Sequence, residues 1–140
     1  MSGPQKFACA IVIDINIRFL LQQRDNKPGI WHPGLIGLFG GHMERGETPL
    51  QCVTREIYEE IGHHAPPQAF ESLAKYTGLE AAGTYEVELY VTEGACIADL
   101  VVTEGTLLVV APEDVFTLVD KLTPSAAFAL EIYLGRPEAE

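Results

Sequence analysis

Positive charge is what this 140-residue sequence has least of: nine Lys and Arg residues stand against 20 Asp and Glu residues, for a formal net charge of −11. A surface that binds duplex or long single-stranded nucleic acid needs many cationic side chains to contact phosphates. We therefore expect no nucleic acid polymer as a partner. A small anionic substrate remains compatible with this charge if divalent metal ions bridge the two negative partners.

Long apolar runs and frequent cysteines are also absent. No apolar stretch approaches the length of a membrane span, and the apolar residues 7–13 end at Asp14 with no cleavage site after them, so we expect no membrane partner and no signal peptide. The three cysteines, Cys9, Cys52 and Cys96, are odd in number and match no zinc-binding spacing. Reduced thiols in a cytoplasmic protein are the simplest interpretation.

What the sequence does contain points to one folded domain spanning residues 1–140. A chain of this length can bury about two-thirds of its unfolded surface. Its hydrophobic content of 47% is typical of a globular protein and excludes disorder. The spacing of apolar residues and turn residues predicts two main helices, over residues 49–61 and from Thr123 onwards, and strands over residues 7–15, 18–23, 35–39, 69–77, 85–92 and 106–110. This mixture indicates an α+β or mixed α/β fold.

The most informative segment covers residues 41–62 and reads G-x5-E-x7-R-E-U-x-E-E-x-G, where U is aliphatic. Seven positions are fixed at set spacing. At roughly 5% usage per residue type, a chance match in a chain of this length has odds on the order of 10⁻⁷. The fixed residues are Gly41, Glu47, Arg55, Glu56, Glu59, Glu60 and Gly62.

Local physical chemistry predicts a helix through the second half of this segment. Thr48 can cap the helix, Pro49 suits its first position, and Gln51 can complete a capping box. Gly62 is a natural stop. At about 100° per residue, the apolar stripe of Leu50, Val53, Ile57 and Ile61 faces the core, while Glu56, Glu59 and Glu60 share an adjacent arc. Arg55 is close enough to Glu59 to form an ion pair.

The pattern resembles the Nudix box, here residues 41–63, which marks hydrolases that cut a diphosphate linked to another group. The resemblance implies a Nudix fold, with a mixed β-sheet sandwiched between helices, and a MutT-like member that uses Mg²⁺, for which Mn²⁺ can substitute. Oxygen ligands suit both ions. Relatives are often homodimers. The sequence departs from the box at His63, where an aliphatic residue is usual. We expect His63 and His64 to satisfy the last helix carbonyls.

The resemblance also implies roles for particular residues. Glu56, Glu59 and Glu60 correspond to metal ligands, with Glu47 as an outer carboxylate or additional ligand, and Arg55 orients a glutamate. A backbone carbonyl of a Gly40-Gly41 turn completes the metal shell. The general base is Glu56 or Glu60, with Glu104 as the alternative. Glu104 resembles a late metal-binding acid of MutT-type members, although Glu86, Glu93 and Glu113 compete for that role.

Two further residues are candidates for substrate binding. Arg24 resembles a phosphate-contacting arginine, and the alternative is a surface arginine paired with Asp25. Trp31 can stack on a base or cover the core. Cys52, one turn before Glu56, is expected to be a packed thiol.

The substrate is only partly defined. A (deoxy)nucleoside triphosphate, cut to the monophosphate and pyrophosphate, is the expected substrate. A nucleotide-sugar or another nucleoside diphosphate derivative is the alternative. A non-catalytic nucleotide-binding module is a third interpretation, which the intact box disfavours.

Overall fold

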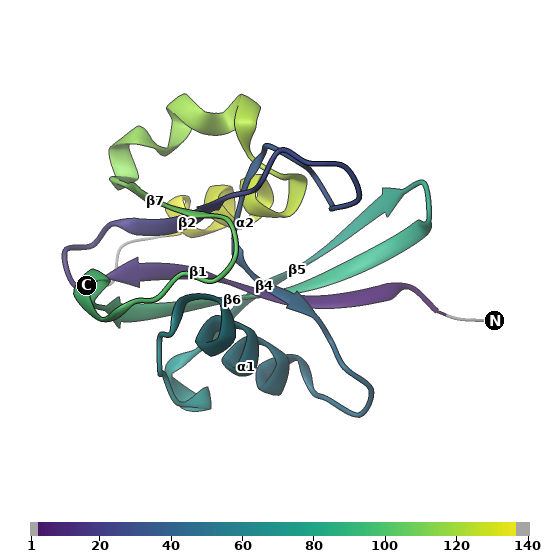
Figure 1. Cartoon of the computed structure of the whole chain (residues 1–140), viewed down its shortest axis with the longest axis horizontal. Coiled ribbons are helices and arrows are strands. Elements are labelled where there is room, and N and C mark those ends of the chain that lie inside the picture. Colours follow the sequence, from purple (N-terminus) through teal and green to yellow (C-terminus); the bar gives the residue numbers. More distant parts are fainter. Residues whose placement is uncertain (1–2, 137–140) are drawn as a thin grey trace.

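A seven-stranded sheet forms the middle layer of the molecule, with one main helix on each face (Figure 1). This is a computed structural model, and it describes residues 3–136 of the chain. Five strands follow one another in the order β3-β2-β1-β6-β5, while β4 pairs with β1 and β7 pairs with β2. The expected fold class, a mixed sheet between helices, is confirmed.

The elements follow the chain in an order that brings late strands back to the centre of the sheet. The bounds are β1 Gln5–Asp14, β2 Phe19–Gln23, β3 Ile36–Gly37, β4 Phe39–His42, α1 Pro49–Ile61, η1 Pro67–Ala69, β5 Glu71–Glu80, β6 Gly83–Ala95, η2 Ile97–Asp99, β7 Thr106–Val110, η3 Pro112–Lys121 and α2 Pro124–Leu134, where η denotes a 3₁₀-helix.

None of the helices between residues 3 and 136 has both the length and the apolar character that crossing a membrane requires.

Strand β1 lies at the centre and separates two hydrophobic cores. It pairs in parallel with β6 and antiparallel with β2 and β4. Because successive side chains of a strand point to opposite faces, Ala8, Ala10 and Val12 pack in the core beneath α1, whereas Ile11 and Ile13 pack in the core beneath α2. Both faces of β1 are therefore covered, which explains its continuous apolar run.

Helix α1 has the limits and the caps that its sequence predicts. The Thr48 side chain accepts a hydrogen bond from the Gln51 N–H, and the Gln51 side chain accepts one from the Thr48 N–H. Gly62 ends the helix, and its N–H donates to the Tyr58 carbonyl. The expected apolar stripe is confirmed, since Val53, Ile57 and Ile61 are fully buried and Leu50 packs against the same core.

The structure corrects the expected turn at Gly40-Gly41. Residues 35–39 do not form one strand, and both glycines lie inside β4, opposite Cys9 and Ala8 of β1. Gly40 has a φ of 143°, and a Cβ there would collide with the Ala8 carbonyl oxygen and the Cys9 backbone. Only glycine lets β4 approach β1 this closely. The pair thus belongs to the strand that forms one wall of the site.

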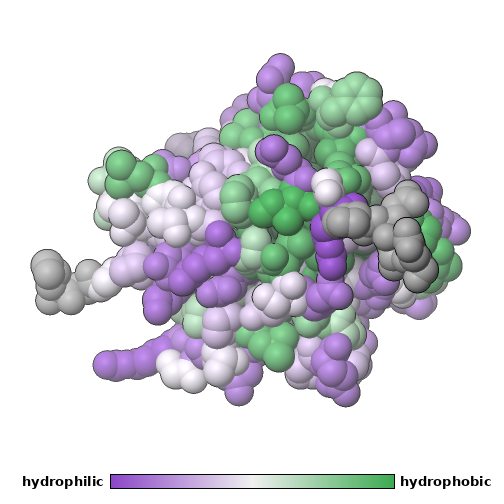
Figure 2. Space-filling model, turned by 180° about the vertical axis from the view of Figure 1, so that it is seen from behind, coloured by the Kyte–Doolittle hydropathy of each residue, from purple (hydrophilic) through white to green (hydrophobic). Residues whose placement is uncertain are grey.

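The hairpin of β5 and β6 is also longer than its sequence predicts. Its strands are joined by residues 81–82 instead of residues 78–83. Gly78 lies in β5, paired with Tyr85 of β6, and the ring of Tyr85 packs where a Cβ at position 78 would lie. Seen from behind, the surface carries hydrophobic residues near its middle with hydrophilic residues around them (Figure 2).

Asp14 stabilises the turn between β1 and β2. Its side chain is almost fully buried, and Oδ1 accepts hydrogen bonds from the backbone N–H groups of Asn16 and Arg18 at 3.0 and 2.8 Å. Oδ2 accepts from Nε of Arg18 at 3.0 Å. Burial raises the pKa of Asp14, but the bonds from Arg18 and Asn16 outweigh it and hold that pKa below its ordinary value.

We therefore expect Asp14→Asn to lower the free energy of unfolding by about 1–2 kcal/mol at pH 7, because an amide cannot accept both Arg18 bonds. A depressed pKa stabilises the fold above the unfolded value of about 3.9, and this contribution is lost as the pH falls through the folded value. The difference between wild type and variant, measured by urea unfolding, should therefore shrink below about pH 4. Asp25→Asn, at a half-exposed pair with Lys27, is the matched control and should change little.

Candidate active site

A cavity of about 330 Å³ opens where β4, α1, the loop after β2 and the turn before β7 meet. Seven of the residues singled out in the sequence line it, from five separate segments of the chain. The lining residues are Phe7, Cys9, Arg24, Trp31, His32, Gly37, Leu38, Gly40, Gly41, His42, Glu56, Glu60, Glu104, Thr123 and Ser125. Acidic side chains gather on one wall and aromatic side chains on the other.

Glu60 lies deepest among the acidic residues, with 6% of its surface exposed. Its Oε1 accepts a hydrogen bond of 2.7 Å from the N–H of Gly40. Burial, followed by the neighbouring Glu104 carboxyl, raises the pKa of Glu60 well above its ordinary value, and the Gly40 N–H acts in the opposite direction. Such a carboxyl binds protons more readily than an exposed glutamate does.

Glu56 packs directly against Gly41. A Cβ at Gly41 would lie about where the Glu56 carboxylate is, with the nearest oxygen at 2.5 Å. Burial raises the pKa of Glu56, while the hydrogen bond from Arg55 lowers it, and the net shift is upward. The two adjacent glycines of β4 therefore contact two glutamates of α1 in different ways, Gly40 by donating an N–H to Glu60 and Gly41 by leaving space for Glu56.

Arg55 holds the outer carboxylates together. Its Nε and Nη2 donate to both oxygens of Glu47 at 2.7 and 2.9 Å, and Nη1 donates to Glu56 at 2.8 Å and to Glu59 at 3.1 Å. The expected pair between Arg55 and Glu59 is confirmed. The bonds from Arg55 lower the pKa of Glu47 to about 2. One guanidinium thus binds three carboxylates at the rim of the cavity.

The turn that carries Glu104 is fastened to the end of α1. Thr103 donates its N–H to the Glu60 carbonyl at 2.8 Å and its hydroxyl to the Glu59 carbonyl at 2.9 Å. The expectation that His63 and His64 satisfy these carbonyls is wrong, and Nε2 of His63 is buried without a hydrogen-bond partner. The loop before β7 takes that role because it folds back over the helix end, which a local sequence pattern cannot show.

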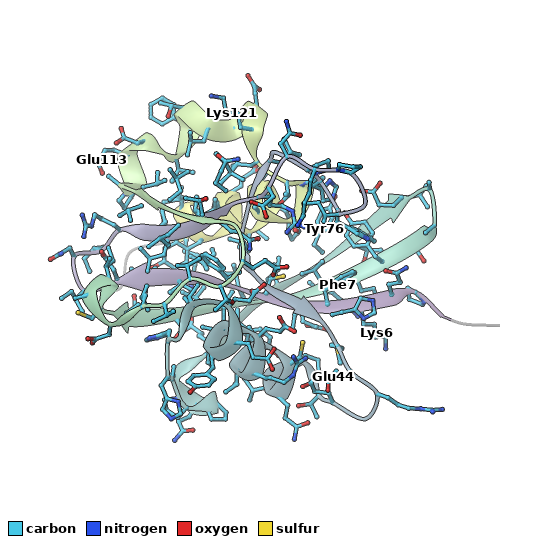
Figure 3. All side chains as sticks on the ribbon, in the orientation of Figure 1. Lys6, Phe7, Glu44, Tyr76, Glu113 and Lys121 are labelled. Atoms are coloured by element: carbon cyan, nitrogen blue, oxygen red, sulfur yellow. The ribbon has the colours of Figure 1, made fainter. Side chains whose placement is uncertain are left out.

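Aromatic rings form the opposite wall of the cavity. The ring centroid of Trp31 lies 5.2 Å from that of Phe7 and 5.0 Å from that of Tyr85, and Phe7 lies 4.7 Å from His42. Trp31 lines the cavity and also packs against the core beneath α2, so both interpretations of it describe part of its position. In Figure 3, Phe7 and Tyr76 mark this side of the molecule.

Arg24 lies between the two walls. Its Nε donates to the Trp31 carbonyl at 2.7 Å and its Nη1 donates to Oε1 of Gln22 at 3.1 Å. The alternative of a surface arginine paired with Asp25 is not what the structure shows, because Asp25 pairs with Lys27. Arg24 is the one lysine or arginine among the described residues that line the cavity.

Other predicted residues lie outside the cavity. The side chain of Glu59 is 55% exposed and turned towards Arg55. None of the competing late acids, Glu86, Glu93 and Glu113, belongs to the lining, and Glu113 lies at the far end of the molecule on η3 (Figure 3). Cys52 is a buried thiol that donates to the Gly41 carbonyl, as expected of a packed cysteine.

Eight other residues line the cavity. Cys9, His32 and His42 had no role in a site assigned from the sequence, and five drew no attention as site residues: Phe7, Gly37, Leu38, Thr123 and Ser125. Thr123 and Ser125 start α2, far along the chain from the box, and Phe7 reads as an ordinary strand residue. No signal in the sequence of this chain alone would have found them, since it is the sheet that brings their segments to the box.

The donor chemistry of the acidic wall fits a hard divalent cation. Glu56, Glu60 and Glu104 offer only oxygen atoms as ligands, and all three line the same small cavity. As placed, Arg55 engages Glu56 and Glu59, while Gly40 engages Glu60. Accordingly, no group of three His, Cys, Asp or Glu side chains between residues 3 and 136 converges as a ready-made metal site. A cation there requires these side chains to turn towards it.

Comparison with known proteins agrees with this geometry. The sequence model of the NUDIX domain matches residues 4–126. The chain therefore belongs to the NUDIX domain family.

Solved structures support the fold. The MutT NUDIX hydrolase of Burkholderia pseudomallei superposes with a TM-score of 0.71 at 24% identity, over 93% of this chain and 98% of that one. The NUDIX domain of Shewanella oneidensis NrtR, complexed with ADP ribose, gives 0.76 at 19% identity, over 95% and 88%. A bifunctional NMN adenylyltransferase/ADP ribose pyrophosphatase of Francisella tularensis, complexed with AMP and Mn ion, gives 0.72 at 18% identity, over 96% and 42%.

Proposed function

We propose that the protein is a metal-dependent pyrophosphohydrolase that cleaves a nucleoside diphosphate linked to another group. The first substrate is a (deoxy)nucleoside triphosphate, released as the monophosphate and pyrophosphate, and a nucleotide-sugar is the alternative. The observation that carries this proposal is one cavity lined by carboxylates, an arginine and aromatic side chains. A diphosphate needs the first two, and a nucleoside base needs the third.

Each side chain has a proposed role in this reaction. Glu56, Glu59 and Glu60, with Glu47 or Glu104 and a backbone carbonyl of Gly40 or Gly41, would hold Mg²⁺ or Mn²⁺. The bound ion would neutralise the diphosphate and make water more acidic. Glu60, whose Oε1 is fixed by the Gly40 N–H, accepts the proton of the attacking water, with Glu56 next and Glu104 as the alternative base. Arg55 keeps Glu56 oriented, and Arg24 faces the phosphates.

The test is a substrate panel that contains nucleoside and deoxynucleoside triphosphates, ADP ribose and nucleotide-sugars, assayed with Mg²⁺ or Mn²⁺ for release of phosphate and pyrophosphate. ADP ribose is included because it is bound by one of the similar structures. We expect pyrophosphate and a monophosphate from a triphosphate. Turnover of nucleotide-sugars alone would select the alternative substrate. Nucleotide binding without turnover of any compound would instead indicate a binding module.

Trp31 offers a separate test of base binding. Stacking of a base on an aromatic side chain is worth about 1–3 kcal/mol. Trp31→Ala should therefore raise KM for the best nucleotide about 5- to 100-fold and change kcat little, while Trp31→Phe should keep most of the affinity. Phe116→Ala, at an aromatic ring on η3 that is 75% exposed, is the control. An unchanged KM in Trp31→Ala would place the base elsewhere.

Broader properties of the protein are also proposals. We propose that residues 1–140 form one domain, of which residues 1–2 and 137–140 lie outside the described part. We further propose that the protein acts in the cytoplasm. We also propose that it forms a homodimer, and light scattering of the purified protein would test this oligomeric state directly.

A further inference from the structure

Gln22 is a buried amide whose two ends are both engaged. It lies on β2 with 2% of its surface exposed. Its Oε1 accepts a hydrogen bond from Nη1 of Arg24 at 3.1 Å, and its Nε2 donates to the backbone carbonyl of Glu104 at 3.1 Å. One side chain thus joins the arginine of the cavity to the acid that follows it 80 positions later in the sequence.

The connection continues on the arginine side. Nε of Arg24 donates to the Trp31 carbonyl at 2.7 Å, so a line of hydrogen bonds runs from Glu104 through Gln22 and Arg24 to Trp31. Three of these four residues, Glu104, Arg24 and Trp31, line the cavity, and Gln22 lies behind them. A second cavity of about 70 Å³ is lined by Gln22, Arg24 and Glu104, so Arg24 and Glu104 lie between the two spaces.

The turn of Glu104 fits closely over Gln22. Gly105 has a φ of 68°, and a Cβ there would lie 2.8 Å from the Gln23 carbonyl oxygen and 2.9 Å from Cγ of Gln22. Thr103 fastens the other side of this turn to α1. The turn that places the Glu104 carboxyl beside Glu60 is therefore held at two points, by the bonds of Thr103 to α1 and by Gln22 of β2. Of these two contacts, only Gln22 is also bonded to Arg24 in the part of the cavity proposed to bind substrate.

We infer that Gln22 is a positioning residue. It fixes Glu104 and Arg24 relative to each other, so that the acid and the phosphate-facing arginine move together. This inference rests on the proposed function. The amide acts on catalysis through Glu104 and on substrate affinity through Arg24 and Trp31. The effect on catalysis depends on Nε2 of Gln22, and the effect on affinity depends on its Oε1. Two substitutions can therefore separate the two effects.

Gln22→Glu keeps an acceptor for Arg24 but replaces the Nε2 donor with an oxygen that repels the Glu104 carbonyl. Gln22→Met has a similar shape and removes both bonds. We expect kcat to fall about 10- to 100-fold in both variants, because a misplacement of about 1 Å can cost that much. KM should rise about fivefold or more in Gln22→Met and stay within about twofold of wild type in Gln22→Glu.

Gln23→Met is the matched control. Gln23 is the neighbouring glutamine on β2, and its Nε2 also donates to a loop carbonyl, that of Gly34 at 2.9 Å. Within the described residues its side chain makes no hydrogen bond to Glu104 or Arg24. It should lose stability without a change in kcat or KM. Gly105→Ala is a second route that leaves Gln22 in place, pushes the Glu104 turn off it, and should reproduce the kinetics of Gln22→Glu. It carries the test if the Gln22 variants fail to fold.

Trp31 is the only tryptophan of the chain. Its intrinsic fluorescence therefore reports on the contact between Arg24 and Trp31 in an experiment that needs no turnover. Its emission maximum should shift in Gln22→Met and not in Gln22→Glu. Wild-type kcat in folded Gln22→Glu or Gly105→Ala, or an unchanged KM in Gln22→Met, would overturn the inference. If wild type turns over no compound of the panel, the proposed function fails, while the emission and the nucleotide Kd of the same variants still decide whether Gln22 couples the two walls.

Discussion

Glu60→Gln is expected to lower kcat by about 10³-fold and at the same time to leave the protein as stable as wild type or more so. The amide cannot accept the proton of the attacking water, which accounts for the loss of turnover. Its oxygen can still accept the 2.7 Å bond from Gly40, so the helix remains docked on β4. A neutral group also removes the cost of a buried carboxylate beside Glu56 and Glu104. Steady-state kinetics and Tm in a buffer with EDTA measure the two effects.

Matched variants separate this result from a general effect of losing an acid. Glu86→Gln removes a carboxylate of β6 that pairs with Lys75 outside the cavity, and it should leave kcat unchanged. Glu104→Gln compares the alternative base. If Glu104→Gln loses more turnover than Glu60→Gln does, the base is Glu104. Retained wild-type turnover in Glu60→Gln at saturating Mg²⁺ would falsify its role, and a fall in Tm would show that its buried charge stabilises the fold.

Arg55→Met is expected to lower both kcat and Tm. Without the guanidinium, Glu47, Glu56 and Glu59 lose their shared partner in a chain that already carries a net charge of −11. Repulsion among them should lower Tm by about 5 °C or more and turn Glu56 away from Gly41, which we expect to lower kcat about 100-fold. Kinetics with Mg²⁺ and a thermal melt of each variant give both values.

Arg55→Lys tests whether charge alone is sufficient. A lysine restores the positive charge but cannot make the parallel pair of bonds that the guanidinium makes to Glu47, so we expect only partial rescue. Arg136→Met removes an exposed arginine whose carboxylate partner within residues 3–136 is Glu71, and it should change neither value appreciably. Full rescue by lysine would mean that the geometry of the fork is unimportant.

Local patterns in the sequence were sufficient for helix α1 and for most of the acidic wall. The capping box, the stop at Gly62 and the apolar stripe define α1 because each acts within a few residues. Helical spacing placed Arg55 beside Glu59. The same spacing could not show that Glu60 is buried and Glu59 exposed, because that difference depends on where β4 crosses the helix.

The rest of the site depends on pairing between distant segments. Gly40 and Gly41 were expected in a turn, since glycines are typical of turns, but contact with β1 places them in a strand. The bond between Gln22 and the Glu104 carbonyl exists only because β7 pairs with β2. Neither strand pairing has a local sequence signature. Residues whose role depends on these pairings therefore cannot be predicted from local patterns in the sequence.

The central position of β1 has a consequence for synthesis on the ribosome. Its parallel partner β6 follows about 80 residues later, so the middle of the sheet cannot close until most of the chain has emerged. Contacts this distant in sequence form slowly, because a long loop must be ordered first. Until then the first strand exposes an unpaired, almost wholly apolar edge, the kind of segment that chaperones shield from aggregation. The strand at the centre of the folded sheet is thus the one most exposed to aggregation while the protein is being synthesised.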